Sequence, residues 1–396
     1  MSEKDFSFGT EILGTGTSLN RIATSPEVVP IYMTNTFVHE DLDKLLEYYA
    51  VKGFNYNRNR NPNRATLMET VSCLENGELS SCFASGMGAI ATAIITFTKA
   101  GDHILSSNTL YGETYEIFTD ILGKYGVEST FIDITNEEEV RANIRPNTKV
   151  IYTETVTNPL MAVPDIAKLA EIAHENEALL IVDNTFMTGA LYRPLNDGAD
   201  LVANSLTKFA NGHSDVMCGS VTGKNELVTK VHNMQVLLGS QSDPFGSWLT
   251  QRGIRTIDLR LKRSAENAMA LAKAMEKLPY VEKVLYPGLE SHPQHEVANR
   301  QFGKYYGGML SIILPEDREK MNKFMRELKL VHYAGTLGGF RTTIAYPALS
   351  SHQSVPRDQR YAIGITDGVL RISCGIEVTE DLVNDFLNAL NVAYGE

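Results

Sequence analysis

Apolar and polar residues follow two different periods along residues 61–250, and each change of period marks a change of element. In RATLMETVSCLEN (64–76), apolar residues recur every three or four positions, and Gly77 follows as a helix stop. ALLIVDNT (178–185) is instead a continuous apolar run, which is typical of a strand buried on both faces of a parallel sheet. Such strands and helices alternate through the segment, so we expect an α/β domain around a mostly parallel sheet.

The segments on either side of this domain have other patterns. Residues 1–60 show weak periodicity, and YAVKGFNYNRNRNPNR (49–64) is polar, aromatic and rich in asparagine, which favours turns. Such a segment cannot bury itself, so we interpret 1–60 as an N-terminal arm that reaches a neighbouring subunit. A long helical stretch at 245–279 precedes mixed strand and helix patterns, and residues 251–396 are predicted to form a smaller α+β domain.

Composition and charge narrow the class of function. The 396 residues are 43% hydrophobic and 21% charged, which is enough for a packed core and for two domains. A net charge of −12 argues against nucleic-acid binding. The absence of a membrane-length apolar run or an N-terminal signal pattern predicts a cytoplasmic protein without membrane contact. The four cysteines are widely spaced, so neither a metal site nor a disulfide framework is expected.

Lys208 directly follows an apolar strand, ADLVANSLT (199–207), which places its ammonium at the inner end of that strand. Two earlier strands lead into Asn158 and into Asp183 with Thr185. Ligands of open α/β sheets bind outside the carboxyl ends of the strands, so these side chains are expected to face one crevice. Taken alone, Asp183 and Lys208 fit a structural ion pair better than a reactive site.

A phosphate site is predicted where FASGMGAI opens a helix with small residues. Free N–H groups and the helix dipole favour an anion there, and hydroxyl groups before the lysine would add donors. Tyr111 follows another strand and offers a ring for stacking on a heterocycle. Close packing of small residues and a core or rim tyrosine are the plain alternatives. The expected phosphate donors are Ser85, Gly86, Met87, Ser205 and Thr207.

A phosphate cradle, a stacking ring, a buried carboxylate and a reactive lysine together indicate pyridoxal 5′-phosphate (PLP). Lys208 would bind this cofactor covalently and shuttle protons, because a depressed pKa makes an amine nucleophilic. Asp183 would keep the pyridine nitrogen protonated, so that the ring accepts electrons from a carbanion. With Thr185 beside Asp183, these residues form the predicted cofactor site.

The segments PIYMTNTF, YNRNRNPN, SGMGAI, ETVTNP, VDNTF, NSLTKF, GTLGG and LRISCGIE occur in this order. In these motifs the chain resembles, over essentially its whole length, the Cys/Met-metabolism family of fold-type I PLP enzymes. The group includes cystathionine γ-lyase, methionine γ-lyase, cystathionine γ-synthase and O-acetylhomoserine sulfhydrylase. The resemblance implies the fold-type I PLP-dependent transferase fold and a homotetramer built from two active dimers.

The resemblance also assigns roles by position. It implies that Lys208 is the Schiff-base lysine, that Asp183 partners the pyridine nitrogen, and that Tyr111 stacks on the ring and assists proton transfer. These three form the predicted catalytic set. Tyr56 and Arg58 match a pair that reaches the phosphate of the neighbouring subunit. The residues matched to the substrate side are Asn158 and Arg371, for the α-carboxylate, and Thr336, near the lysine and the substrate.

The implied activity is γ-elimination from a sulfur amino acid such as cystathionine or methionine, or from a related amino acid, which yields a 2-oxo acid and ammonia. γ-Replacement uses the same residues and stays open, as do β-elimination of cystathionine and a non-catalytic PLP-binding regulator. Position by position, the chain departs from common family residues on the substrate side. The departures are Met33, Glu113, Gly335 and Arg341.

Glu113 lies two residues after the stacking Tyr111, at a position that the resemblance places near the substrate side chain. One interpretation is that it turns outward or pairs with Arg341. This interpretation is favoured by the cost of burying a carboxylate that faces an empty apolar pocket. The other is that its carboxylate recognises a substrate with a distal cation or hydrogen-bond donor. The sequence leaves both open.

Overall fold

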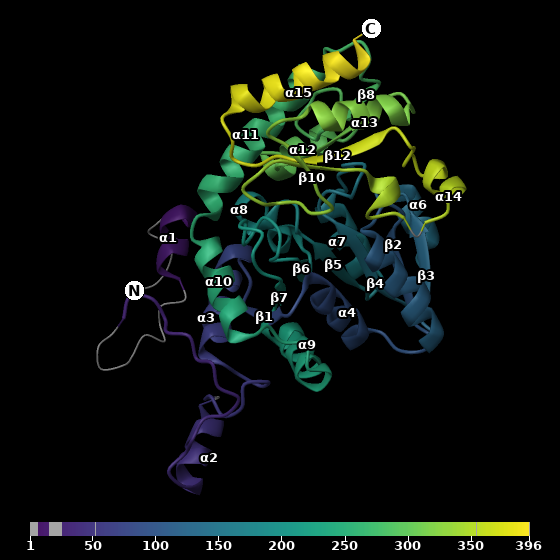
Figure 1. Ribbon diagram of the computed structural model, residues 1–396. Coiled ribbons are helices and arrows are strands. Elements are labelled where there is room, and N and C mark those ends of the chain that lie inside the picture. The colour runs from purple at the N-terminus through teal and green to yellow at the C-terminus, as the bar shows by residue number, and fades with distance from the viewer. Residues whose placement is uncertain (1–6, 16–25, 52, 354, 396) are drawn as a thin grey trace.

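Two β-sheets organise the computed structural model, which describes residues 7–15, 26–51, 53–353 and 355–395 (Figure 1). The larger sheet has the strand order β1-β7-β6-β5-β4-β2-β3, and the smaller one β10-β11-β12-β9-β8. The large-sheet strands are β1 (Leu79–Phe83), β2 (His103–Ser107), β3 (Glu128–Ile132), β4 (Thr148–Glu154), β5 (Leu179–Asp183), β6 (Leu201–Asn204) and β7 (Gly219–Gly223). The small-sheet strands are β8 (Lys283–Leu285), β9 (Met309–Ile313), β10 (His332–Tyr333), β11 (Thr343–Ala345) and β12 (Val369–Ser373).

Strands β3, β2, β4, β5 and β6 run parallel, whereas β7 is antiparallel to both of its neighbours, β6 and β1. The continuous apolar runs are explained by burial on both faces. One face carries Ile151, Leu180, Val182 and Val202, and the other carries Val150, Tyr152, Ile181, Leu201 and Ala203. The mostly parallel sheet predicted from the sequence is therefore present, with an antiparallel edge.

Helices cover both faces of the large sheet (Figure 1). Apolar residues of α3 and α7 pack on one face, and those of α4 and α9 pack on the other. The helices of this region are α3 (Pro62–Glu75), α4 (Gly86–Phe97), α5 (Gly112–Glu116), α6 (Glu137–Asn143), α7 (Ile166–Glu175), α8 (Thr188–Leu191), α9 (Asn225–Leu238) and α10 (Pro244–Ile254). Short η segments add a π-helix, η1 (Ile117–Ile121), and the 3-10 helices η2 (Leu122–Tyr125) and η3 (Pro194–Asp197).

The small sheet is covered by α11, α13 and α15, whose apolar residues share one core with its strands. This is the smaller α+β unit expected after the α/β domain. Its helices are α11 (Ile257–Met275), α12 (His295–Phe302), α13 (Arg318–Glu327), α14 (Arg357–Ala362) and α15 (Thr379–Tyr394), with the 3-10 helix η4 (Pro347–Leu349). Among the described residues, no helix is long and apolar enough to span a membrane.

The stretch predicted as one long helix is two helices. α10 ends at Ile254 and α11 begins at Ile257, because α10 packs against α3 whereas α11 packs against α15 and the small sheet. Arg255 and Thr256 form the turn between them. The predicted boundary at residue 250 falls within α10, so the division into 61–250 and 251–396 stays a prediction at that position.

The N-terminal segment differs from an extended arm, because it contains the helices α1 (Phe8–Gly14) and α2 (Leu42–Ala50). Ile12 of α1 is 1% exposed and belongs to the main core, so α1 packs on its own chain. α2 has no buried residue and projects from the body at the end far from α15 (Figure 1). Among the described residues of this segment, only the part around α2 therefore has the geometry of an arm.

Candidate active site

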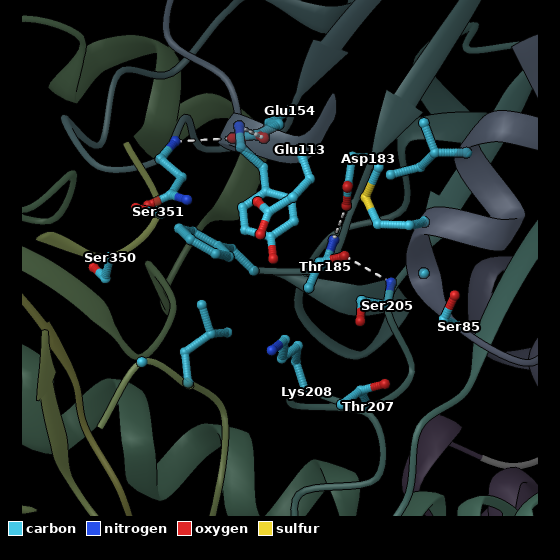
Figure 2. A pocket seen from close by; sticks show the side chains of 18 of the residues that line it. Ser85, Glu113, Glu154, Asp183, Thr185, Ser205, Thr207, Lys208, Ser350 and Ser351 are labelled. Carbon is cyan, nitrogen blue, oxygen red and sulfur yellow. Dashed lines mark hydrogen bonds between the residues drawn. The ribbon is translucent and has the colours of Figure 1, made fainter. Parts of the chain in front are cut away.

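A cavity of about 420 Å³ lies at the carboxyl ends of β4, β5 and β6 and also contacts the loops and β12 of the small sheet. This is the place where open α/β sheets bind ligands. Every predicted site residue except Tyr56, Arg58 and Thr336 lines it. Figure 2 shows side chains that line this cavity, with Lys208 pointing into it.

The phosphate end is built by the start of α4. Ser85 caps this helix, because its Oγ accepts a hydrogen bond from Gly88 N at 3.0 Å. The other N–H groups of the first turn, those of Gly86 and Met87, have no acceptor within the helix, so they can bind an anion. A Cβ on Gly86 would lie 2.6 Å from Cβ of Ser205, so only glycine lets the helix start approach the end of β6 this closely.

Thr207 and Ser205, which precede Lys208, are held in place by different hydrogen bonds. Thr207 Oγ1 donates to the carbonyl of Cys218 at 3.2 Å and accepts from its N–H at 3.0 Å. A hydroxyl has one proton, so Thr207 would have to release this bond before donating to a phosphate. Ser205 N donates to Thr185 Oγ1 at 2.8 Å, which connects the ends of β6 and β5 (Figure 2).

Asp183 ends β5 and is 9% exposed. Its Oδ1 accepts from Thr185 N at 2.9 Å, and burial raises its pKa above the usual range of an aspartic acid. Glu154 lies directly opposite on β4, so two carboxyl groups share this buried edge. A protonated ring nitrogen placed against Asp183 would supply the missing positive charge, which is the charge that PLP carries at its pyridine ring.

Lys208 is held by the small-domain loop that contains the GTLGG motif. Gly338 has φ +74°, and a Cβ there would lie 2.8 Å from the Lys208 carbonyl carbon and 2.4 Å from Phe209 N. Gly338 N also donates to Ser373 Oγ at 2.8 Å. Burial, and then the nearby positive charge of Arg371, lower the pKa of Lys208. The amine is therefore more available as a nucleophile than an exposed lysine.

Glu154 is a site residue that the sequence analysis missed. Its Oε1 accepts from Tyr111 N and its Oε2 from Asn158 N, both at 2.8 Å (Figure 2). Burial, and then Asp183, raise the pKa of Glu154 above the usual range of a glutamic acid. The carboxyl group of Glu154 thus fixes the backbone of Tyr111 and the backbone of Asn158. Its signal was the acidic residue of ETVTNP at the end of a strand.

Arg371 comes from β12 of the small sheet and is 4% exposed. Its Nη1 donates to Asn158 Oδ1 at 3.0 Å. Burial lowers the pKa of Arg371 to about 10, and nearby Tyr111 and Glu154 oppose that shift. A guanidinium has five donors in a planar fork, so Arg371 retains donors for a carboxylate in the cavity.

Glu113 lies in the first turn of α5 and lines the cavity at its exposed edge. Burial, and then the negative charge of Glu113, raise the pKa of the Tyr111 hydroxyl. In the described part of the chain Glu113 forms no ion pair, and Arg341 instead lies over the ring of Phe340. The interpretation in which Glu113 pairs with Arg341 is therefore not the arrangement in this structure.

Three predicted residues lie outside the cavity of the single chain. Arg58 Nη1 donates to the carbonyl of Val236 at 2.7 Å, and its guanidinium lies 5.9 Å from the ring centroid of Tyr56, which is 43% exposed. Thr336 is flanked by Gly335 and Leu337, which both line the cavity although Thr336 does not. Loop residues that lacked a sequence signal line it instead, among them Met217, Ser350 and Ser351.

The residues fit PLP, because an anion-binding helix start, a buried carboxylate and a buried amine converge on one cavity. A family profile described as Cys/Met metabolism PLP-dependent enzyme matches residues 9–391. The chain is 43% identical over 363 residues to cystathionine gamma-lyase of Bacillus subtilis, covering 91% of this chain and 93% of the relative. It is 37% identical over 395 residues to L-methionine gamma-lyase of Fusobacterium nucleatum subsp. polymorphum, covering 98% and 99%.

A solved structure, that of metB from Corynebacterium glutamicum, has the same fold. It superposes with a TM-score of 0.93 at 37% identity, covering 98% of this chain and 99% of that one. The expected fold class and cofactor are confirmed by these findings. The protein belongs to the family of Cys/Met metabolism PLP-dependent enzymes.

Proposed function

We propose that the protein is a PLP-dependent γ-lyase for a sulfur amino acid or a related γ-substituted amino acid. The observation that carries the proposal is the convergence of Lys208, Asp183 and Arg371 on one cavity. The names of the relatives, cystathionine gamma-lyase and L-methionine gamma-lyase, support γ-elimination as the reaction. The products would be a 2-oxo acid, ammonia and the released γ-substituent.

Each wall of the cavity would hold one part of the cofactor. The start of α4, with the hydroxyl of Ser205, would bind the phosphate, Asp183 would face the pyridine nitrogen, and the ring of Tyr111 would stack on the pyridine. The amine of Lys208 would form the covalent attachment. Bound there, PLP supplies a ring that withdraws electrons from the α-carbon of the substrate.

The remaining residues would position the amino acid and move protons. Arg371 and Asn158, joined at 3.0 Å, would bind the α-carboxylate through the free donors of the guanidinium. Lys208 Nζ, with its lowered pKa, would carry the proton taken from the α-carbon, and Tyr111 would assist its transfer. Glu154 would keep Tyr111 and Asn158 in register through its two hydrogen bonds.

We also propose that the active unit is a dimer and that two dimers form a tetramer in the cytoplasm. α2 exposes apolar side chains, with Leu42 77% and Leu46 63% exposed, which a neighbouring subunit would cover. Tyr56 and Arg58, on the same segment, would then contact the neighbour's phosphate. The free thiols of Cys73, Cys82, Cys218 and Cys374 suit a reducing compartment.

Subunit mixing tests the shared site. Arg58→Ala and Lys208→Ala subunits, each inactive alone, are expected to regain activity when mixed, because a hybrid dimer contains one site with neither lesion. Native mass spectrometry would verify that hybrids form. Hybrids without activity would show that Arg58 does not serve the neighbouring site.

A substrate panel tests the reaction. Cystathionine, methionine, homocysteine, cysteine and O-acyl homoserines would be incubated with and without an added thiol, and the products identified by mass spectrometry. We expect 2-oxobutanoate from the γ-substituted compounds. Thioether products that form only with added thiol would indicate γ-replacement, pyruvate from cystathionine would indicate β-elimination, and no turnover of any amino acid would favour a regulatory protein.

A further inference from the structure

The cavity is charged unequally along its length. Arg371 lies buried at one side and is already bonded to Asn158, whereas Glu113 lies at the exposed edge. The carboxyl group of Asp183 lies at the inner wall. Under the proposed function Arg371 takes the α-carboxylate and Asp183 faces the cofactor, which leaves the Glu113 carboxylate for the far end of the substrate.

Glu113 has no cation of its own in the described chain. No lysine, arginine or histidine there lies within ion-pair distance of it, although its negative charge acts on Lys208 and opposes the lowering of that lysine's pKa. Lys208 is committed to the cofactor under the proposed function. A cationic group on the substrate is then the partner that the site itself lacks.

The backbone holds Glu113 at this edge. A Cβ on the preceding residue, Gly112, would lie 2.1 Å from the carbonyl oxygen of Ser351, so the start of α5 and the loop at 350–351 are in close contact. Ser350 and Ser351 also line the cavity. The Ser350 hydroxyl donates to the carbonyl of Tyr346 at 2.8 Å, and the Ser351 hydroxyl bonds His352 Nδ1 at 2.9 Å. The Glu113 carboxylate therefore remains the main acceptor that this edge offers to a ligand with N–H donors.

There is also room for a distal group. Gly335 lines the cavity, and a Cβ built on it would meet no atom within 4 Å. The substrate edge is therefore open rather than filled by a side chain at this position. A neutral methyl group, as on methionine, would place no positive charge opposite the carboxylate, which would keep only its hydrogen bond with the Tyr111 hydroxyl.

We infer that Glu113 selects substrates whose γ-substituent ends in a cationic, multi-donor group such as an ammonium or a guanidinium. The inference rests on the proposed function and specifies its substrate class. A distal end with an ammonium and a carboxylate, as in cystathionine, would gain attraction from one charge and repulsion from the other. An end that carries only positive charge is therefore the preferred class, cystathionine is intermediate, and methionine is the poorest.

Two thioethers of equal length isolate this charge. S-(2-aminoethyl)-L-homocysteine ends in an ammonium, and S-propyl-L-homocysteine has a methyl group in its place. In γ-elimination the Cγ–S bond breaks, the sulfur leaves with a proton as the thiol, and one water is consumed to give 2-oxobutanoate and ammonia. The two reactions therefore differ only in the thiol that is released.

The variant Glu113→Gln removes the charge and keeps the shape. We expect kcat/KM for the aminoethyl substrate to fall about fivefold, because a charge pair at an exposed edge contributes up to about 1 kcal/mol. The propyl substrate should change by less than about threefold. Added salt should weaken turnover of the aminoethyl substrate by the wild type more than by the variant. Glu116→Gln, on the same helix but outside the cavity, is the matched control and should spare both substrates.

The outcomes separate the inference from the proposed function. An equal loss on both substrates, or no loss on either, would overturn charge selection while leaving γ-elimination intact. If the wild type releases 2-oxobutanoate from neither compound, the proposed function fails. The dissociation constants of the two compounds, measured from the absorbance of the bound cofactor, would then still decide whether Glu113 favours the cation.

Discussion

The inner wall and the outer edge of the cavity are built in different ways. The inner wall consists of the ends of β4, β5 and β6, whose polar groups bond one another, as Asp183 with Thr185 and Thr185 with Ser205. The edge is formed by loops and a short helix that bring Glu113, Gly335 and Ser351 together from distant parts of the chain. The wall is fixed by a sheet that is buried on both faces. The loops of the edge can therefore differ, and accept another substrate, without disturbing the residues of the wall that carry the reaction.

The largest expected effect comes from removing the reactive group of the wall. Lys208→Ala should lower kcat by at least about 10³-fold, since a positioned acid or base contributes about 10²–10⁴-fold and the covalent anchor is lost as well. Borohydride reduction followed by peptide mapping should place the cofactor label on Lys208 in the wild type. A label on another lysine would mean that the wall has been assigned the wrong reactive group.

Asp183→Asn separates function from stability on the same wall. Activity should fall by about 30-fold or more, because the cofactor nitrogen loses its charged partner. The cofactor-free variant should melt at a higher temperature than the cofactor-free wild type near neutral pH. Burial raises the folded-state pKa of Asp183, so the stability it contributes is present below the unfolded-state pKa and is lost as pH rises through the folded-state pKa.

The difference in melting temperature between the Asp183→Asn variant and the wild type should therefore grow as pH rises above the unfolded-state pKa of aspartic acid. Calorimetry of both cofactor-free proteins at several pH values measures it. A wild type that is the more stable at high pH would show that the buried charge is already compensated within the chain.

The wall was largely predictable because its signals are local. Continuous apolar runs that end in polar residues located β4, β5 and β6, and the residues after them proved to share one cavity. Strand β1 had no such signal. Its buried Ser80 bonds Thr222 of β7 at 2.8 Å and its Ser81 bonds Gln235 of α9 at 2.9 Å, so these polar side chains are satisfied by neighbouring elements without an apolar period.

The edge could not be predicted to the same depth, because its residues meet only through tertiary packing. Met217, Ser350 and Ser351 carry no pattern that marks them, and the sequence could not decide between the two orientations of Glu113. Thr207 shows that prediction of the inner wall is limited as well, because its hydroxyl donates its one hydrogen bond to the carbonyl of Cys218. A motif identifies a residue but not its hydrogen-bond partners.

Glu154 connects the two regions, and its variant should have an intermediate effect. Glu154→Gln replaces one acceptor oxygen by a donor that faces the N–H of Tyr111 or Asn158. We expect kcat/KM to fall roughly tenfold, the effect of about 1.4 kcal/mol, with a lower kcat through Tyr111 and a higher KM through Asn158 and Arg371.

A pH profile distinguishes this positioning role of Glu154 from general loss of structure. The raised pKa of Glu154 means that it takes up a proton at a higher pH than an ordinary glutamic acid, so the wild type should lose activity on the acidic side through this group. Glutamine does not titrate, and the variant should lack that limb. An unchanged acidic limb in the variant would assign it to another group.

The smallest expected effect lies at the edge, and two glycines of one loop provide the comparison. Gly335→Ala should leave the melting temperature within about 1 °C of the wild type, because its added Cβ meets no atom within 4 Å and surface changes of this kind stay within about 0.5 kcal/mol. Gly338→Ala, three residues later, is the contrasting control. Its φ of +74° and its contact with the backbone of Lys208 and Phe209 should destabilise the protein by about 1–3 kcal/mol and displace the reactive lysine. Thermal melting and kinetics of both variants would measure the contrast, and a Gly335→Ala variant as damaged as Gly338→Ala would show that the edge is as tightly built as the wall.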